Sequence, residues 1–292
     1  MKKTILVAGS ANLDFVVRAA HIPAAGETVL GRDFQTFPGG KGANQAIASA
    51  RAGGAATQML LALGADSFAA AIEASLNEAG VRLHVVRVAG QPTGTAFICL
   101  ADDAENAITV APGANSLLCA EHLPSLDGVS HLLLQLETPI EAVTAYAEAA
   151  RAAGVTVVLN AAPAQALPPA LLAAVDVLIV NEGELAAIGG EAAVPAVPTL
   201  VVTLGARGCR ARQLGEWLCL PAFAVKAIDT TAAGDTFCGV LAAALGDGET
   251  LRVAMRRASA AAAIACTRLG AQASIPTRAE VDAFLRLHPL AE

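Results

Sequence analysis

The chain has 292 residues, of which 55 % are hydrophobic and 3 % aromatic, and its formal net charge is −7. This length allows one large α/β domain or two small ones, and the apolar content excludes a disordered chain. The negative charge argues against nucleic acid as a partner, because phosphate backbones are bound by clustered Lys and Arg.

The sequence favours a reduced, cytoplasmic protein with no membrane partner. No apolar run approaches the roughly 20 residues that a membrane-spanning helix needs. The first apolar run is broken by Gly9, Ser10, Asn12 and Asp14, which favours a buried strand over a signal peptide. The six cysteines include no Cys-x-x-Cys pair, and the five histidines lack metal-ligand spacing.

Apolar runs typical of buried strands alternate with helical segments along most of the chain. Strands are predicted at 5–9, 57–62, 131–135, 155–159, 175–180 and 199–203. Helices are predicted at 42–51, 68–79, 140–152, 182–188, 233–244, 251–267 and 278–287. Continuous apolar strands between helices predict an α/β fold, with a parallel sheet covered by helices on both faces.

Two stretches, about 15–37 and 85–111, interrupt this alternation with β-type residues and turn glycines. The second stretch contains a predicted hairpin, 95–100 with 107–110. We expect both stretches to be insertions that pair into a small sheet, within one domain that spans 1–292. A small sheet at the edge of a ligand cleft is a plausible lid.

Polar residues follow the first strand and the strand at 131–135. Asn12 and Asp14 suit hydroxyl groups, because ligands of open α/β sheets bind beyond the carboxyl ends of strands. A simple turn explains these two residues equally well. Glu137 precedes a predicted helix start, where Thr138 is the cap and Glu141 completes a capping box. That helix start does not need Glu137.

The run 39–44, Gly-Gly-Lys-Gly-Ala-Asn, precedes a predicted helix. Its glycines let the backbone approach a ligand, and the helix is expected to present free N–H groups. The run is not a Walker P-loop, because Gly42 stands where Ser or Thr would be. A tight strand-to-helix turn is the alternative explanation.

Two later turns are candidates for nucleotide contacts. Asn181 and Glu184 have the spacing of a capping box, and this structural role is as good an explanation as a nucleotide or magnesium role. Thr203, Gly205 and Gly208 follow an apolar strand and could contact phosphate or ribose, although such turns are common. The absence of G-x-G-x-x-G disfavours a dehydrogenase.

The strongest segment is 229–237, Asp-Thr-Thr-Ala-Ala-Gly-Asp-Thr-Phe. Small residues open a helix there, so several backbone N–H groups can form an anion hole for a transferring phosphoryl group. Asp235 lies in the first turn, where it could accept a proton from an attacking hydroxyl. The helix dipole alone would explain Asp235, but not the small residues before it.

The runs 39–44 and 229–237, in this order and spacing, resemble the two signatures of the ribokinase (PfkB-type) sugar kinase family. The likeness extends from about Thr4 to Phe284. It implies a Rossmann-like domain with a small β lid that often joins a partner's lid in a homodimer. It also implies phosphoryl transfer from Mg·ATP to the primary hydroxyl of a small sugar. Within the family, 39–44, 159–164 and 270–272 favour the members that convert ribose to ribose 5-phosphate.

The same resemblance implies roles for individual positions. The sugar-binding positions are Asn12, Asp14, Gly40, Lys41, Asn44 and Glu137. The nucleotide positions are Asn181, Thr203, Gly205, Gly208, Gly234 and Ser259, and Glu184 helps to hold magnesium through water. The anion hole matches Ala232, Ala233 and Gly234, and the base is Asp235. A site for a monovalent cation, usually potassium, matches Asp229, Thr231, Ala265, Arg268, Gly270 and Ser274.

Two alternatives remain at this point. Sister kinases of the family act on deoxyribose, fructose or nucleosides, although few aromatic residues stand near the expected sugar site and a nucleobase needs stacking partners. A non-catalytic sugar or nucleotide sensor on the same fold is disfavoured by the intact Asp235 and its anion hole.

Overall fold

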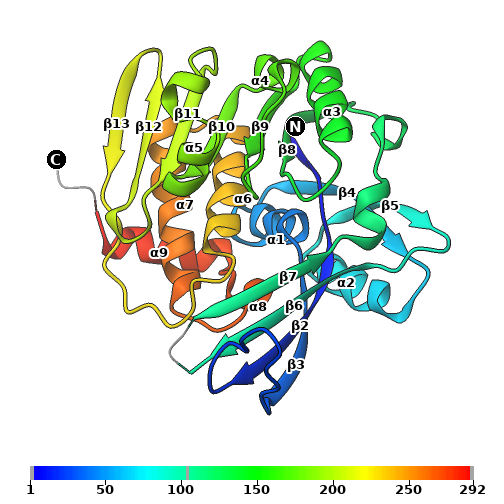
Figure 1. Ribbon diagram of the computed structural model, residues 1–292. Coiled ribbons are helices and arrows are strands. Elements are labelled where there is room, and N and C mark those ends of the chain that lie inside the picture. The colour runs from blue at the N-terminus through cyan, green and yellow to red at the C-terminus, as the bar shows by residue number, and fades with distance from the viewer. Residues whose placement is uncertain (1–2, 103–104, 290–292) are drawn as a thin grey trace.

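The computed structural model describes residues 3–102 and 105–289, so both ends of the expected 1–292 domain lie outside the described residues. Within these ranges nine strands form one sheet, in the order β13-β12-β11-β10-β9-β8-β1-β4-β5 (Figure 1). The strands from β11 to β5 are parallel, and β12 and β13 add an antiparallel hairpin. Their bounds are β1 Thr4–Ala8, β4 Ala56–Gly64, β5 Arg82–Val88, β8 Val129–Leu134, β9 Thr156–Asn160, β10 Val177–Asn181, β11 Thr199–Thr203, β12 Cys209–Gln213 and β13 Glu216–Leu220.

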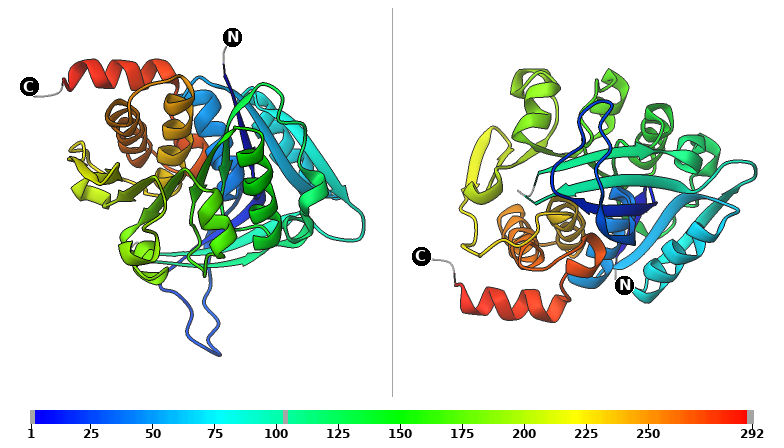
Figure 2. Two further views of the ribbon diagram at one scale, coloured as in Figure 1. Left: turned by 90° about the horizontal axis from the view of Figure 1, so that it is seen from above. Right: turned by 60° about the horizontal axis from the view of Figure 1, so that its bottom comes forward.

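Helices cover both faces of this sheet, which confirms the predicted α/β class (Figure 2). One core lies beneath α1 Lys41–Ile47, α2 Ser67–Glu78, α6 Ala233–Gly246, α7 Leu251–Cys266 and α9 Arg278–Leu287. The other lies beneath α3 Ile140–Ala152, α4 Pro169–Ala174 and α5 Glu182–Ala187. Alternate residues of β1 serve the two cores, with Ile5 and Val7 in the first and Leu6 and Ala8 in the second. No helix in the described part of the chain could cross a bilayer.

Helices α1 and α6 approach each other closely because Gly239 lacks a side chain. A Cβ at Gly239 would lie 2.3 Å from the carbonyl oxygen of Gln45 and 2.7 Å from the Cβ of Ala48. Asp235 lies one turn before Gly239 on the same side of α6. The contact therefore brings the beginning of α6 beside α1.

A second sheet, in the order β3-β2-β6-β7, projects from the main domain (Figure 1). Its strands are β2 Asn12–Ala19, β3 Arg32–Gly39, β6 Gly94–Ala101 and β7 Asn106–Ala111, which confirms the predicted small sheet and its hairpin. The expected start of the second insertion at 85 is corrected, because β5 pairs with β4 in the main sheet. This edge strand is only half-buried and carries Arg82, His84 and Arg87, so its pattern resembled that of the small sheet.

The two faces of the small sheet differ. Strand pairing aligns Asp14 with Ala96 and Ala96 with Val110, so these residues share one face. Phe15 and Phe97 are also aligned and occupy the opposite face. The face that carries Asp14 is the face toward Glu137 and Asp235, whose charges act on Asp14.

Other local predictions also need correction. The capping box predicted at Thr138 and Glu141 is not formed, because Thr138 is buried and Pro139 takes the cap position without a side-chain hydrogen bond. The hairpin β12–β13 was not predicted, since polar residues such as Arg210 and Arg212 interrupt its apolar pattern. The short helices α4 and α8 (Ala271–Ser274) were also missed.

Candidate active site

The polar residues predicted after β1 and β8 meet where the strand order reverses. From β1, the chain builds β4 and β5 on one side and β8 to β11 on the other. Ligands of open α/β sheets bind beyond the strand ends at such a point. The Ser10 hydroxyl, just after β1, donates to Glu137 Oε2 at 2.6 Å, and the Lys41 backbone N–H donates to the same oxygen at 3.1 Å. Glu137 therefore connects three segments of the site.

The glycines of the run 39–44 are required by contacts within the protein. A Cβ at Gly39 would lie 2.1 Å from Asp14 Oδ2, and one at Gly42 would lie 2.7 Å from Ser10 N. Gly40 has φ 88°, and a Cβ there would lie 2.8 Å from Ala11 Cα. The alternative of a tight turn thus accounts for all three glycines.

The expectation of free N–H groups at the start of α1 is wrong. The N–H of Lys41 donates to Glu137, that of Gly42 to Ser10 Oγ, and that of Ala43 to the Ser10 carbonyl. The N–H groups at the start of helix α1 therefore bind the turn after β1 and Glu137, and they are not free for a ligand. Helix α1 contributes side chains to the site.

Asn12 is buried and held by a residue that the sequence analysis did not single out. The Asn115 amide donates to Asn12 Oδ1 at 2.8 Å, and Asn115 Oδ1 accepts the Ala11 N–H at 3.1 Å. Asn115 lies in a 3-10 turn, Gly113–Leu117, and no local pattern marked it. It acts as a bridge that fixes the amide of Asn12 in place.

Several charges converge on this site. Burial, followed by the negative charges of Glu137 and Asp235, raises the pKa of Asp14 from 3.8 to about 7. Burial alone would lower the pKa of Lys41, but the carboxylates of Asp235, Glu137 and Glu184 outweigh it, so this pKa is raised. The Lys41 ammonium thus interacts with the charges of Glu137 and Asp235, at the predicted sugar positions, and with the charge of Glu184, at the predicted nucleotide side.

The beginning of α6 retains unpaired N–H groups. Its cap, Ala232, has a left-handed backbone with φ 57°. The Ala233 N–H donates to the Thr230 carbonyl at 3.2 Å, so that group of the predicted anion hole is engaged. Gly234 and Asp235 have no acceptor within the first turn, and no other described residue accepts from their N–H groups. A Cβ at Gly234 would meet nothing within 4 Å, so the space beside this residue is open.

The Asp235 side chain is buried at the contact between α6 and α1. Its Oδ2 accepts from the Asn44 amide at 2.9 Å, and its Oδ1 accepts from the Gln45 amide at 2.9 Å. Asn44 was predicted, whereas Gln45 was not, although it follows directly in the glycine-rich run. The predicted base and a predicted sugar-binding residue are therefore in direct contact.

The predicted nucleotide positions gather at the ends of β10 and β11. Asn181 and Thr203 are aligned neighbours at these ends. Gly208 has φ 102°, and a Cβ there would lie 2.1 Å from the Leu220 carbonyl oxygen. Ser259, on α7, lies with its Oγ 3.5 Å from the sulfur of Cys209, beside Gly208. Gly205 begins the short turn that follows β11.

Asn181 and Glu184 form the capping box that their spacing predicted. The Glu184 N–H donates to Asn181 Oδ1 and the Asn181 N–H donates to Glu184 Oε2, each at 2.7 Å. Burial raises the pKa of Glu184, while the Asn181 N–H and the Lys41 charge partly oppose this effect. The structural explanation is therefore correct, and the Glu184 carboxylate still faces the charges of the site.

The segments of the predicted cation site lie against each other. Asp229 Oδ1 accepts the Thr231 N–H at 2.8 Å, and Oδ2 accepts the Gly270 N–H at 2.9 Å. Burial raises the pKa of Asp229, but these donors outweigh it and the pKa is lowered. Ser274 is buried and donates to the Ala271 carbonyl at 2.8 Å. Among the described residues, no three His, Cys, Asp or Glu side chains form a metal-binding group.

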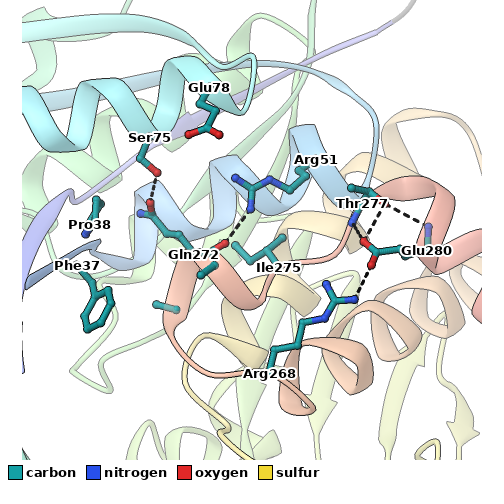
Figure 3. Close-up of a pocket in the computed structure, with 12 residues that line it drawn as sticks. Phe37, Pro38, Arg51, Ser75, Glu78, Arg268, Gln272, Ile275, Thr277 and Glu280 are labelled. Carbon is teal, nitrogen blue, oxygen red and sulfur yellow. Dashed lines mark hydrogen bonds and ion pairs between the residues drawn. The ribbon is translucent and has the colours of Figure 1, made fainter. Parts of the chain in front are cut away.

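The Arg268 side chain does not enter the predicted cation site. It pairs with Glu280 at 2.5 Å, as Figure 3 shows. Both residues line a cavity of about 570 Å³ that also contacts Arg51 and Gln272. The Ala265 carbonyl accepts the Arg268 N–H at 3.0 Å, so the backbone of this segment forms a closed turn.

A carboxylate beside free helix N–H groups, at the switch point of an α/β sheet and under a small β sheet, is suited to phosphoryl transfer to a hydroxyl group. Comparison with known families agrees. Residues 2–278 match the model of the pfkB family carbohydrate kinases, and the chain belongs to this family.

Individual relatives match over nearly their whole length. The ribokinase of Haemophilus influenzae is 40 % identical, with 98 % of this chain and 99 % of the relative covered. The crystal structure of Thermotoga maritima ribokinase has a TM-score of 0.91 and 37 % identity, covering 97 % of this chain and 99 % of that one. A structure of Arabidopsis thaliana ribokinase, complexed with ribose and ATP, has a TM-score of 0.88 and 31 % identity, covering 98 % and 99 %.

The raised pKa of Asp14 leads to a prediction about stability. Between pH 3.8 and about 7 the folded protein keeps a proton that the unfolded chain has lost, so stability falls as the pH rises through this range. Asp14→Asn removes this loss. We expect the ligand-free variant to be more stable than the wild type by about 1 to 4 kcal/mol at pH 8, and by much less at pH 4.

Urea unfolding at both pH values measures this difference. Asp33→Asn, which alters an exposed carboxylate on the neighbouring strand β3, is the matched control and should show a much smaller dependence on pH. An Asp14→Asn gain that is equal at pH 4 and pH 8 would contradict the explanation by buried charge.

Proposed function

We propose that this chain transfers the γ-phosphoryl group of ATP to the primary hydroxyl of ribose, giving ribose 5-phosphate and ADP. The observation that carries the proposal is the buried Asp235 carboxylate next to the free N–H groups of Gly234 and Asp235. The similarity over the whole chain to ribokinases supports ribose as the sugar. A sensor would need neither this base nor this anion hole.

The sugar is held by the polar groups after β1 and β8 and at the start of α1. These are Asn12, Asp14, Gly40, Lys41, Asn44 and Glu137. Asp235 accepts the proton as the hydroxyl oxygen forms its bond to the γ-phosphorus, and the bond to the β-phosphate oxygen breaks. The free N–H groups of Gly234 and Asp235 stabilise the charge on the transferring group. Most of the acceleration comes from positioning.

The nucleotide lies along the ends of β10 and β11, against Asn181, Thr203, Gly205, Gly208, Gly234 and Ser259. Magnesium would reach the protein through water held by Glu184, and would neutralise charge on the phosphates. The carboxylates of Asp235, Glu137 and Glu184 raise the pKa of Lys41, so its ammonium stays positively charged between the proposed sugar and nucleotide positions.

A monovalent cation, which is usually potassium in this family, would lie beside the anion hole. The oxygens that would hold it belong to Asp229, Thr231, Ala265, Arg268, Gly270 and Ser274. Direct contact between the two segments supports this role, because Gly270 donates to Asp229. Equal activity in potassium chloride and tetramethylammonium chloride at one ionic strength would exclude it.

The small sheet is the lid of the sugar site, and its outer face joins a second copy of the chain. On that face the rings of Phe34 and Phe97 stack on Phe15 at centroid distances of 6.1 and 5.3 Å. Phe15 also contacts Phe68 of α2, yet Phe34 and Phe97 remain 63 % and 53 % exposed. An exposed aromatic cluster of this kind favours association.

Sedimentation tests this homodimer. We expect Phe34→Asp to convert the dimer into a monomer at micromolar concentration, because a carboxylate would be buried in an apolar contact. Leu214→Asp changes an even more exposed apolar residue, in the β12–β13 turn, and should leave the assembly unchanged. A monomeric wild type would refute the proposed association.

We also infer that the chain works in the cytoplasm. All six cysteines are free thiols in the described structure, and Cys209 and Cys238 are buried. Free thiols suit a reducing compartment. Recovery of the protein in a periplasmic or secreted fraction would contradict this location.

A panel of sugars tests the substrate. We expect ribose to give a higher kcat/KM than deoxyribose, fructose or adenosine, because the sugar positions offer amides and carboxylates and few aromatic rings. The measurement is ADP release with each sugar and ATP. A preference of more than about tenfold for another substrate, or about 1.4 kcal/mol, would assign the chain to a sister activity.

Asp235→Asn tests the base. The variant keeps the shape of the side chain but removes the proton acceptor, so we expect kcat to fall by at least about 10²-fold. Ribose affinity should fall less, and ATP affinity should barely change. Steady-state kinetics and calorimetric binding separate these effects. A kcat near that of the wild type would exclude Asp235 as the base and direct attention to Asp14.

A further inference from the structure

A chain of three buried amides lies against Asp235. Gln45 and Gln135 are fully buried, and Asn160 at the end of β9 is 7 % exposed. The Gln45 amide nitrogen donates to Asp235 Oδ1 at 2.9 Å and to Asn160 Oδ1 at 3.0 Å. The Gln45 amide oxygen accepts from the Gln135 nitrogen at 2.7 Å. None of these three residues was assigned a role above.

The hydrogen bonds fix which way each amide points. The Ile179 carbonyl can only accept, so the Asn160 nitrogen faces it at 3.3 Å and the Asn160 oxygen faces Gln45. Gln45 must therefore present its nitrogen to Asn160, and the same nitrogen reaches Asp235. Gln135 fixes the Gln45 amide in the same orientation, because the Gln135 nitrogen donates to the Gln45 side-chain oxygen.

The backbone at Gly9 leaves room for one of these side chains. A Cβ at Gly9 would lie 1.9 Å from the Gln135 side-chain amide oxygen. The Gln135 oxygen has no hydrogen-bond partner among the described residues. Burying an unpaired oxygen costs free energy that an apolar side chain would avoid. Stability alone therefore does not explain why Gln135 occupies this position.

We propose that Gln45 is a positioning residue that fixes the carboxylate plane of Asp235, and that Gln135 acts through Gln45 by holding the direction of its amide. The inference rests on the proposed role of Asp235 as the base. Asn44 holds the other carboxylate oxygen but also belongs to the proposed sugar site. Gln45 is fully buried behind Asp235, so its contribution is to the geometry of proton transfer.

Kinetics of Gln45→Met, Gln135→Met and the double variant test this proposal. Methionine keeps the length of the side chain and removes its hydrogen bonds. We expect Gln45→Met to lower kcat by about 10- to 100-fold while the KM for ribose changes by less than about threefold, because misplaced reacting groups cost mainly turnover. Gln135→Met should lower kcat by about 3- to 10-fold, and the double variant should be no slower than Gln45→Met.

Thr57→Val is the matched control. It removes a buried hydrogen bond of 3.0 Å between Thr57 and Ser49, in the segment that follows α1, without touching the amides. Its kcat should equal that of the wild type, even if its melting temperature falls as much as that of Gln45→Met. If Gln45→Met does not fold, the kcat of Gln135→Met tests the proposal instead. Gln135→Met should remain folded, because it removes a buried oxygen that has no hydrogen-bond partner among the described residues.

Three results would overturn the inference: a kcat within about twofold of the wild type in folded Gln45→Met, parallel changes in kcat and KM, or additive effects in the double variant. Asp235→Asn measured alongside separates the two hypotheses. A low kcat in Asp235→Asn with a normal kcat in Gln45→Met rejects only the positioning role. A normal kcat in Asp235→Asn rejects the base and the positioning role together.

Discussion

The contact between α1 and α6 is the constraint on which the rest of the site depends. Gly239 allows the two helices to approach, and Asp235, one turn earlier, then meets Asn44 and Gln45. A side chain at Gly239 would separate the helices and remove both donors from the carboxylate. The small residues of this part of the core therefore determine chemistry as well as packing.

The electrostatics of the site follow from this close packing. Glu137 and Asp235 lie near enough to Asp14 for their negative charges to act on it, and together with burial they raise its pKa. The positive charge of Lys41 offsets part of the repulsion among these carboxylates, and it also attracts the carboxylate of Glu184. The arrangement costs stability in the empty protein, as is common where polar groups await a ligand. Under the proposed function, hydroxyl groups of the sugar would donate hydrogen bonds to these carboxylates.

Sequence patterns predicted the fold well where the elements are long and apolar. Helices 140–152 and 278–287 and strand 199–203 have the predicted bounds. The half-buried strand β5 was assigned to the small sheet, and the polar hairpin β12–β13 was missed. In both, the pattern of polar and apolar residues depends on which strands and helices pack against them, and the local sequence does not show this. In the site, residues at strand ends could be predicted from the fold rule. Asn115 and Gln135 could not, since their importance depends on partners more than 85 positions away.

The starts of helices α1 and α6 have the same local sequence signal, and they show why some site features cannot be predicted from sequence alone. Both α1 and α6 begin after small residues, and both were expected to offer free N–H groups. At α1 the turn after β1 supplies Ser10, and Glu137 supplies a carboxylate, so the first N–H groups are used within the protein. At α6 no described residue accepts from Gly234 or Asp235, and space remains above Gly234. The first start forms a structural joint, whereas the second keeps the free N–H groups that an anion site requires, because only the first has acceptors within reach.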